Sequence, residues 1–117
     1  MAKKVIISCA VTGAIHTPSM SEFLPVTAEE VIEHSLAAHE AGAAVLHLHA
    51  RDENDGHPTQ DPEEFQKFLP TSHNSCDAVI NITTGGGPQM TVEERMKPAM
   101  HFLSLIHISE PTRLSRI

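Results

Sequence analysis

Three segments of this chain repeat one order: an apolar strand, a turn-rich loop and a helix that begins with a capping residue. The caps are Thr27, Asp61 and Thr91, which lie 34 and 30 residues apart. Glu30 completes a capping box with Thr27, and Pro62 suits the first helical position after Asp61. A period of about 30 residues occurs both in (β/α)₈ barrels of about 250 residues and in doubly wound sheets. The period therefore predicts an α/β fold with parallel strands, and three units cannot close a barrel.

The three expected strands are apolar enough to be covered on both faces, as strands of parallel sheets are. They span Lys3 to Val11, Val45 to Arg51 and Asp77 to Thr84. The expected helices run from Thr27 to about Ala41, from Asp61 to Pro70, which should end it, and from Thr91 to about Met100. Gly42 supplies the left-handed position after the first helix.

Charge and cysteine content narrow the class of protein. The formal net charge is −7, and nucleic-acid binding requires a basic surface instead. No apolar run reaches the roughly 20 residues of a membrane span, and no signal peptide opens the chain. Cys9 and Cys76 are isolated, which suggests free thiols in a reducing compartment. We therefore expect a cytoplasmic protein without nucleic-acid or membrane partners.

Residues 103–117 have a sequence that points to a different origin from the rest of the chain. The segment from Leu103 to Arg113 is, codon for codon, the translation of an adapter used in DNA sequencing. A native strand and turn is the alternative. We expect residues 1–102 to be the N-terminal part of a longer protein and residues 103–117 to be an adapter-derived tail, which is excluded from fold reasoning.

His47 and His49 stand two residues apart in the second expected strand. Because strand side chains alternate, both imidazoles share one face, with Cα atoms roughly 6–7 Å apart. Two neutral imidazoles can converge on one zinc ion, which in catalytic sites has three protein ligands and an open position. A third ligand should then lie further along the chain. The alternative is two core or loop histidines with satisfied hydrogen bonds.

Polar residues follow the carboxyl ends of all three expected strands. In parallel α/β folds ligands bind at this edge of the sheet. The loop of Thr83, Thr84 and three glycines could hold a carboxylate or phosphate, although a tight turn is an alternative. The residues concerned are Thr12, Gly13 and His16 after the first strand, His47, His49 and Arg51 after the second, and Thr83, Thr84, Gly85 and Gly86 after the third.

These motifs, in this order, resemble the β-keto acid cleavage enzymes of the 3-keto-5-aminohexanoate cleavage type. The matching segments are Thr12 to Ala14, His47 to Arg51, Ile82 to Gly86 and Met90 to Arg95. The resemblance covers residues 1–102.

The resemblance implies a zinc-dependent (β/α)₈ TIM barrel, of which this chain holds about three units. Such enzymes transfer an acyl group between a β-keto acid and acetyl-CoA, giving a CoA ester and an acetoacetate-type product. By position, His47 and His49 match the zinc histidines, and Thr83 and Gly86 match substrate-binding positions. The third zinc ligand, a glutamate, and a catalytic arginine–aspartate pair would follow Phe102. The chain would then carry no catalytic residue and be inactive alone, and the complete enzyme would be a homo-oligomer.

One position departs from the family pattern. The aminohexanoate enzymes carry a glutamate after Thr-Gly-Ala, suited to an ammonium group, where this chain has Ile15. We therefore expect a different, uncharged β-keto acid.

Two other functions remain open at this point. Amidohydrolase-type enzymes also place His-x-His in a barrel strand, but in the first one, whereas here a strand precedes it. A non-enzymatic, histidine-rich metal-binding module would bind metal as an isolated chain. The chain has nine histidines.

Overall fold

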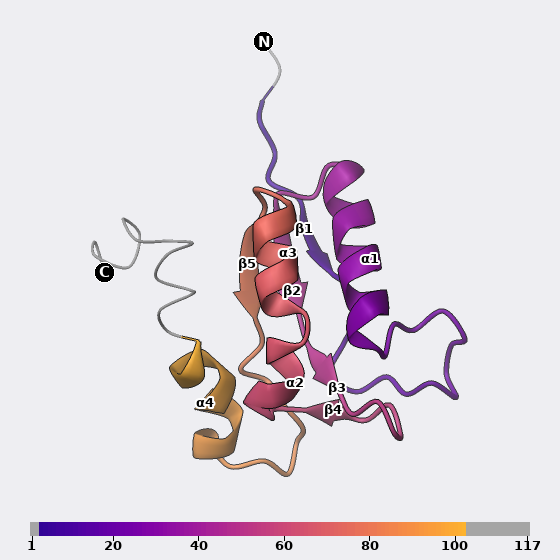
Figure 1. The fold of residues 1–117 in the computed structure, drawn as a ribbon, viewed down its shortest axis with the longest axis vertical. Coiled ribbons are helices and arrows are strands. Elements are labelled where there is room, and N and C mark those ends of the chain that lie inside the picture. The colour runs from indigo at the N-terminus through magenta and orange to yellow at the C-terminus, as the bar shows by residue number, and fades with distance from the viewer. Residues whose placement is uncertain (1–2, 103–117) are drawn as a thin grey trace.

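A computed structural model describes residues 3–102, so the expected adapter-derived tail lies outside the described residues. Strands β1 (Ser8–Ala10), β2 (Val45–Leu48) and β5 (Val79–Ile82) form a parallel sheet in the order β1-β2-β5 (Figure 1). Its register places His47 beside Ala10 on one side and Asn81 on the other. The prediction of an α/β fold with parallel strands is confirmed.

The helices are α1 (Ala28–Glu40), α2 (Pro62–Gln66), α3 (Leu69–Ser75) and α4 (Val92–His101). All three predicted caps are present. The Thr27 hydroxyl accepts from the Glu30 N–H at 3.2 Å, and the Glu30 carboxylate accepts from the Thr27 N–H at 3.0 Å, which completes the capping box. The Asp61 carboxylate accepts from the Glu63 N–H at the start of α2, and the Thr91 hydroxyl accepts from the Glu94 N–H at the start of α4. Gly42 has a φ of 122°, as the end of α1 requires.

The second predicted helix is two helices. The chain turns at Lys67 and Phe68, between α2 and α3. Pro70 does not end a helix, as the sequence predicted, but lies in the first turn of α3. Proline is tolerated there because the N–H that it lacks would have no partner within the helix.

The expected strand from Val45 to Arg51 is interrupted at His49. Its last two residues form β3 (Ala50–Arg51), which pairs antiparallel with β4 (Pro58–Thr59). The polar loop predicted after Arg51 is therefore the connection of a small hairpin. This hairpin lies beyond the carboxyl end of β2 (Figure 1).

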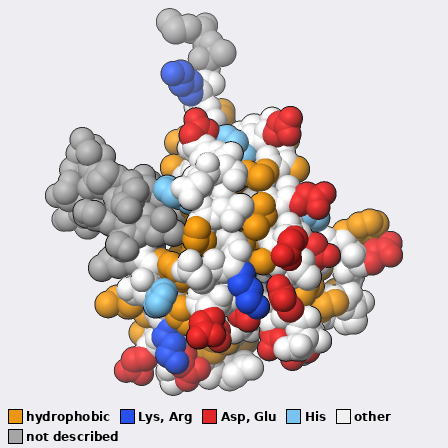
Figure 2. Space-filling model, viewed as in Figure 1, with side chains coloured by type: hydrophobic (Ala, Val, Ile, Leu, Met, Phe, Trp, Pro, Cys, Tyr) orange, Lys and Arg blue, Asp and Glu red, His pale blue; other side chains and the backbone are white. Residues whose placement is uncertain are grey.

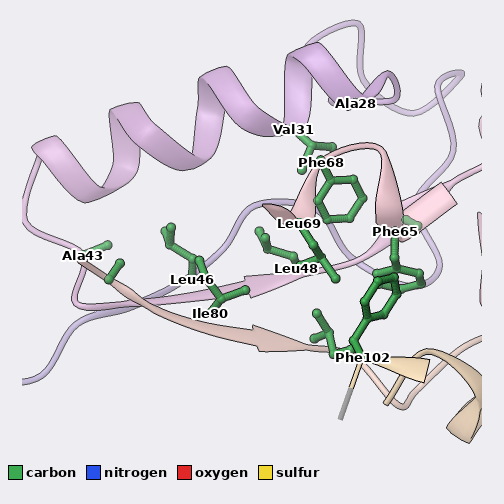
Figure 3. Packing of buried hydrophobic residues seen from close by; sticks show 13 residues of the cluster. Ala28, Val31, Ala43, Leu46, Leu48, Phe65, Phe68, Leu69, Ile80 and Phe102 are labelled. Atoms are coloured by element: carbon green, nitrogen blue, oxygen red, sulfur yellow. The ribbon is translucent and has the colours of Figure 1, made fainter. Parts of the chain in front are cut away.

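The core lies between one face of the sheet and the helices. Leu46, Leu48 and Ile80 project from the strands toward α1 and α3, where Val31 and Leu69 meet them (Figure 3). The alternate residues of β2 and β5 face the other way and are half-buried or exposed. His47 belongs to this second, open face.

The prediction that the first strand is covered on both faces is wrong for this chain. Val5, Ile6 and Ile7 are 79%, 77% and 53% exposed, and β1 begins only at Ser8. Among residues 3–102, only β2 pairs with β1, so these apolar residues receive no cover.

The described surface is mixed in character. Figure 2 shows acidic side chains spread over the visible face, with hydrophobic side chains between them. Within residues 3–102, none of the helices has the length and hydrophobicity needed to span a membrane.

Candidate functional site at the carboxyl edge of the sheet

The two predicted metal ligands lie side by side. His47 is in β2 and His49 in the break between β2 and β3. Their ring centroids are 5.0 Å apart and the ring planes meet at 83°, so the edge of one ring faces the other. This proximity confirms the pairing that the alternation of strand residues predicted.

His49 is held in its neutral form. Its side chain is buried, with 7% of the residue exposed. Burial lowers its pKa to about 4, and the neighbouring His47 and the Arg51 cation act in the same direction. A neutral imidazole keeps a nitrogen lone pair at neutral pH, as a metal ligand must.

His47 has a partner on the neighbouring strand. Its Nδ1 lies 2.5 Å from Oδ1 of Asn81, the residue beside it in the register of β2 and β5. An amide oxygen only accepts hydrogen bonds, so Nδ1 of His47 is the donor. The sequence analysis missed Asn81. Its signal was a polar residue in an otherwise apolar strand, two positions before Thr83.

Arg51, two residues after His49, is buried, with 2% exposed. Its Nε donates to the Thr12 hydroxyl at 2.8 Å, and Nη2 donates to the Gly13 carbonyl at 2.6 Å. Nη1 donates to the carbonyls of His16 and Gly56, the latter at 2.8 Å. Burial lowers the pKa of this guanidinium. Arg51 thus ties the loop after β1 to the hairpin after β2.

The predicted site residues of the first loop differ in whether they contact Arg51 through the side chain or the backbone. Thr12 and Gly13 bind Arg51, whereas His16 contributes only its backbone carbonyl. The His16 ring packs over Gly13, where an added Cβ would lie 2.7 Å from its Nδ1. The structure therefore does not bring the His16 side chain into the pair formed by His47 and His49.

The third loop begins at buried Thr83. Its hydroxyl accepts from the Gly85 N–H at 2.9 Å, which leaves its own proton available for donation. Its backbone carbonyl accepts from Nε2 of Gln60, a buried residue that the sequence analysis did not select. Gln60 Nε2 also donates to the Arg95 carbonyl at 2.9 Å, so it fixes this loop against α4.

Gly86 has a left-handed φ of 55°. A Cβ at this position would lie 2.7 Å from Sδ of Met90 and 3.1 Å from Cγ of Gln60. The residue is buried beneath these side chains, so its glycine identity is required by both space and backbone conformation.

A cavity of about 400 Å³ lies between the first loop, the hairpin and the third loop. Ile15, the position that departs from the family pattern, is part of its wall. The lining residues include Thr17, His57, Pro58, Pro88 and Met90.

The described residues supply only part of the ligand set that a metal ion needs. In residues 3–102, no three side chains from His, Cys, Asp and Glu gather closely enough to hold a metal ion. The neutral His49 and the oriented His47 nevertheless fit zinc, which accepts imidazole nitrogen. They would supply two of its ligands.

Comparison with known proteins identifies relatives of the chain. A protein of Paraburkholderia graminis, 3,5-dioxohexanoate:acetyl-CoA acetone transferase, is 66% identical over 100 residues, which are 86% of this chain and 32% of the relative. The 3-keto-5-aminohexanoate cleavage enzyme of Acetoanaerobium sticklandii is 42% identical over 82% of this chain and 35% of its own length. Its Fusobacterium nucleatum counterpart is 41% identical over 84% of this chain and 36% of its own length.

The chain thus spans about a third of the length of these curated relatives. The sequence model of the beta-keto acid cleavage enzymes matches residues 4–110, nearly the whole chain. The resemblance inferred from the motifs is confirmed by this match, and the chain belongs to the beta-keto acid cleavage enzyme family.

Proposed function

We propose that this chain forms the first three strand–helix units of a zinc-dependent β-keto acid cleavage enzyme built on a (β/α)₈ barrel. The complete enzyme would exchange an acyl group between a β-keto acid and acetyl-CoA, giving a CoA ester and an acetoacetate-type product. Family membership and the acetyl-CoA transferase name of the Paraburkholderia graminis relative support the reaction class. The parallel strands support the barrel, whose remaining units would cover the exposed residues near β1.

The pair of His47 and His49 is the observation that carries the zinc proposal. The rings lie 5.0 Å apart at the carboxyl edge of β2, and burial keeps His49 neutral. A third ligand would come from outside the described residues, and the family resemblance assigns a glutamate to that role. When bound, zinc would act as a Lewis acid toward a substrate carbonyl oxygen.

The residues of this chain would bind and orient the substrate. The Thr83 hydroxyl has a proton to donate to a substrate oxygen, because its acceptor side is occupied by the Gly85 N–H. Gly86 lets the backbone of the third loop turn beneath Met90. The chain would hold no catalytic residue of its own, so we expect no turnover from it alone.

We propose that the substrate is a β-keto acid without an ammonium group, of the 3,5-dioxohexanoate type. The relative that shares 66% identity carries this compound in its name. Ile15 supports the same substrate, because an apolar side chain offers no counter-charge to an ammonium group. The free thiols of Cys9 and Cys76 fit a cytoplasmic enzyme, and we expect the complete enzyme to be a homo-oligomer.

The other two functions have less support. Family membership favours acyl transfer over amidohydrolase chemistry. A self-sufficient metal-binding module would need a third ligand, and residues 3–102 do not place one near the pair.

A chimera tests the proposal. Residues 1–102 of this chain would replace the matching segment of the Paraburkholderia graminis relative, which supplies the remaining two thirds. The chimera should bind zinc and convert 3,5-dioxohexanoate with acetyl-CoA. His47→Ala and His49→Ala should each abolish both properties. His34→Ala, which alters an exposed histidine of α1, is the matched control. Full zinc content and unchanged turnover in both site variants would refute the proposal.

A further inference from the structure

The two nitrogens of the His47 ring are not equivalent in this structure. Nδ1 lies 2.5 Å from the amide oxygen of Asn81. Since that oxygen can only accept, the hydrogen of a neutral His47 ring is on Nδ1, and Nε2 carries the lone pair. A free neutral imidazole can place its hydrogen on either nitrogen, so the contact with Asn81 selects one of two tautomers.

The sheet fixes this contact. His47 and Asn81 are register partners on the adjacent parallel strands β2 and β5. The neighbouring register pairs, Leu46 with Ile80 and Leu48 with Ile82, lie in the core on the opposite face and are at most 8% exposed. A shift of either strand by one residue would bury His47 and expose leucine. The packing of the core therefore holds Asn81 beside His47.

We propose that Asn81 is a positioning residue, which holds the hydrogen of His47 on Nδ1 and thereby presents Nε2 as the metal-binding nitrogen. This inference rests on the proposed zinc function. Metal-bound histidines generally donate their other N–H to a carboxylate, a carbonyl or water, and this partner fixes the ring orientation. Asn81 fills that role with a neutral amide, so it orients the ring without adding negative charge to the site.

The first test needs no metal. The 117-residue chain would be labelled with ¹⁵N-histidine and studied by long-range ¹H–¹⁵N NMR near pH 8.5, where ordinary imidazoles are neutral. Loss of a signal in His47→Gln assigns the residue. The unaltered chain and Asn81→Asp should carry the hydrogen on Nδ1, because both offer an oxygen acceptor. Asn81→Leu should shift His47 toward the Nε2–H tautomer. Asn74→Leu makes the same change at an exposed position of α3 and should have no effect.

The second test measures zinc affinity in the chimera by competition with a chelator. Loss of such a partner weakens metal binding by about 10- to 100-fold. We expect a loss of this size in Asn81→Leu, retained affinity in Asn81→Asp and no change in Asn74→Leu. If Asn81→Leu does not fold, Asn81→Ala takes its place. The tautomer of His47 in the unaltered chain tests the inference without any variant of Asn81.

Two results would overturn the inference: an Nε2–H tautomer of His47 in the unaltered chain, or an unchanged zinc Kd in Asn81→Leu. Absence of zinc from the unaltered chimera would instead refute the proposed zinc enzyme, and with it the metal role of Asn81. The NMR measurement separates these failures, because it reports the hydrogen bond without metal.

Discussion

Arg51 and Thr12 are joined by a buried hydrogen bond of 2.8 Å from Nε to the hydroxyl, across 39 residues of sequence. The same guanidinium binds the carbonyls of Gly13, His16 and Gly56. All these acceptors are neutral. The role of Arg51 in the structure is therefore to fix two loops at the edge of the sheet, beside the paired histidines.

Loss of this cation should destabilise the chain. Arg51→Met removes the donors and leaves buried acceptors without partners, and hydrogen bonds to charged groups contribute about 1.5–3 kcal/mol each. We expect the free energy of unfolding in urea, followed by circular dichroism, to fall by at least that amount. Arg95→Met is the control, because exposed Arg95 donates from its side chain to the Thr84 carbonyl at 2.9 Å. Equal losses in both variants would contradict the role assigned to Arg51.

The local signals in the sequence predicted most of the helices. The caps at Thr27, Asp61 and Thr91 depend on side-chain hydrogen bonds within three residues, so they can be read directly from the sequence. Pro70 was misread because proline both ends helices and begins them. The turn at Lys67 and Phe68, which separates α2 from α3, shows that here it begins one.

The sequence predicted the two candidate metal ligands, but it did not predict the residues that hold the site in place. Alternation along a strand places His47 and His49 together without knowledge of the fold. Asn81 and Gln60 act across 34 and 23 residues, and their partners depend on strand register and loop packing. The exposure of Val5 likewise depends on which neighbours a strand has, which its own composition does not specify.

Gly86→Ala should be costly, because the backbone is left-handed there and the new methyl group would lie 2.7 Å from Sδ of Met90. The backbone conformation alone costs a non-glycine residue about 1–2 kcal/mol. We expect urea unfolding to show a loss of this size and the chimera to show a raised KM for the keto acid. Gly87→Ala is the matched control, since its nearest contacts are 3.6 Å away. A loss as large in Gly87→Ala would exclude this explanation.

The start of α1 should weaken in acid. The Glu30 carboxylate accepts from the backbone N–H of Val26 at 2.8 Å and of Thr27 at 3.0 Å. These hydrogen bonds lower the pKa of Glu30 below its usual value of 4.5, and the bond from Val26 has the larger effect. Since the folded state binds the proton less readily than the unfolded chain, this stabilisation is present above pH 4.5 and is lost as the pH falls through the lowered pKa.

Thermal melts of the chain and of Glu30→Gln, recorded from pH 7 to pH 3, measure this contribution. The difference in Tm between the two should be largest near pH 7 and shrink in acid. Glu29→Gln, at an exposed glutamate in the same turn, is the control. A difference between the chain and Glu30→Gln that stays constant with pH would count against the carboxylate as the source.

Ile15→Glu should alter substrate preference in the chimera. Ile15 is 69% exposed and borders the cavity of about 400 Å³ between the three loops. A carboxylate there could pair with the ammonium group of 3-keto-5-aminohexanoate, whereas isoleucine cannot. Solvent-exposed ion pairs contribute about 0.2–1 kcal/mol, so we expect the ratio of kcat/KM for the aminated over the dioxo substrate to rise by up to about fivefold.

Ile15→Gln separates charge from polarity, because glutamine has nearly the shape of glutamate without its charge. Its ratio should stay close to that of the unaltered chimera, and added salt should reduce the gain of the glutamate variant, since salt screens exposed charges. If glutamine and glutamate raised the ratio equally, polarity rather than pairing with an ammonium group would be responsible. If neither changed it, position 15 would not contact the part of the substrate that distinguishes the two keto acids.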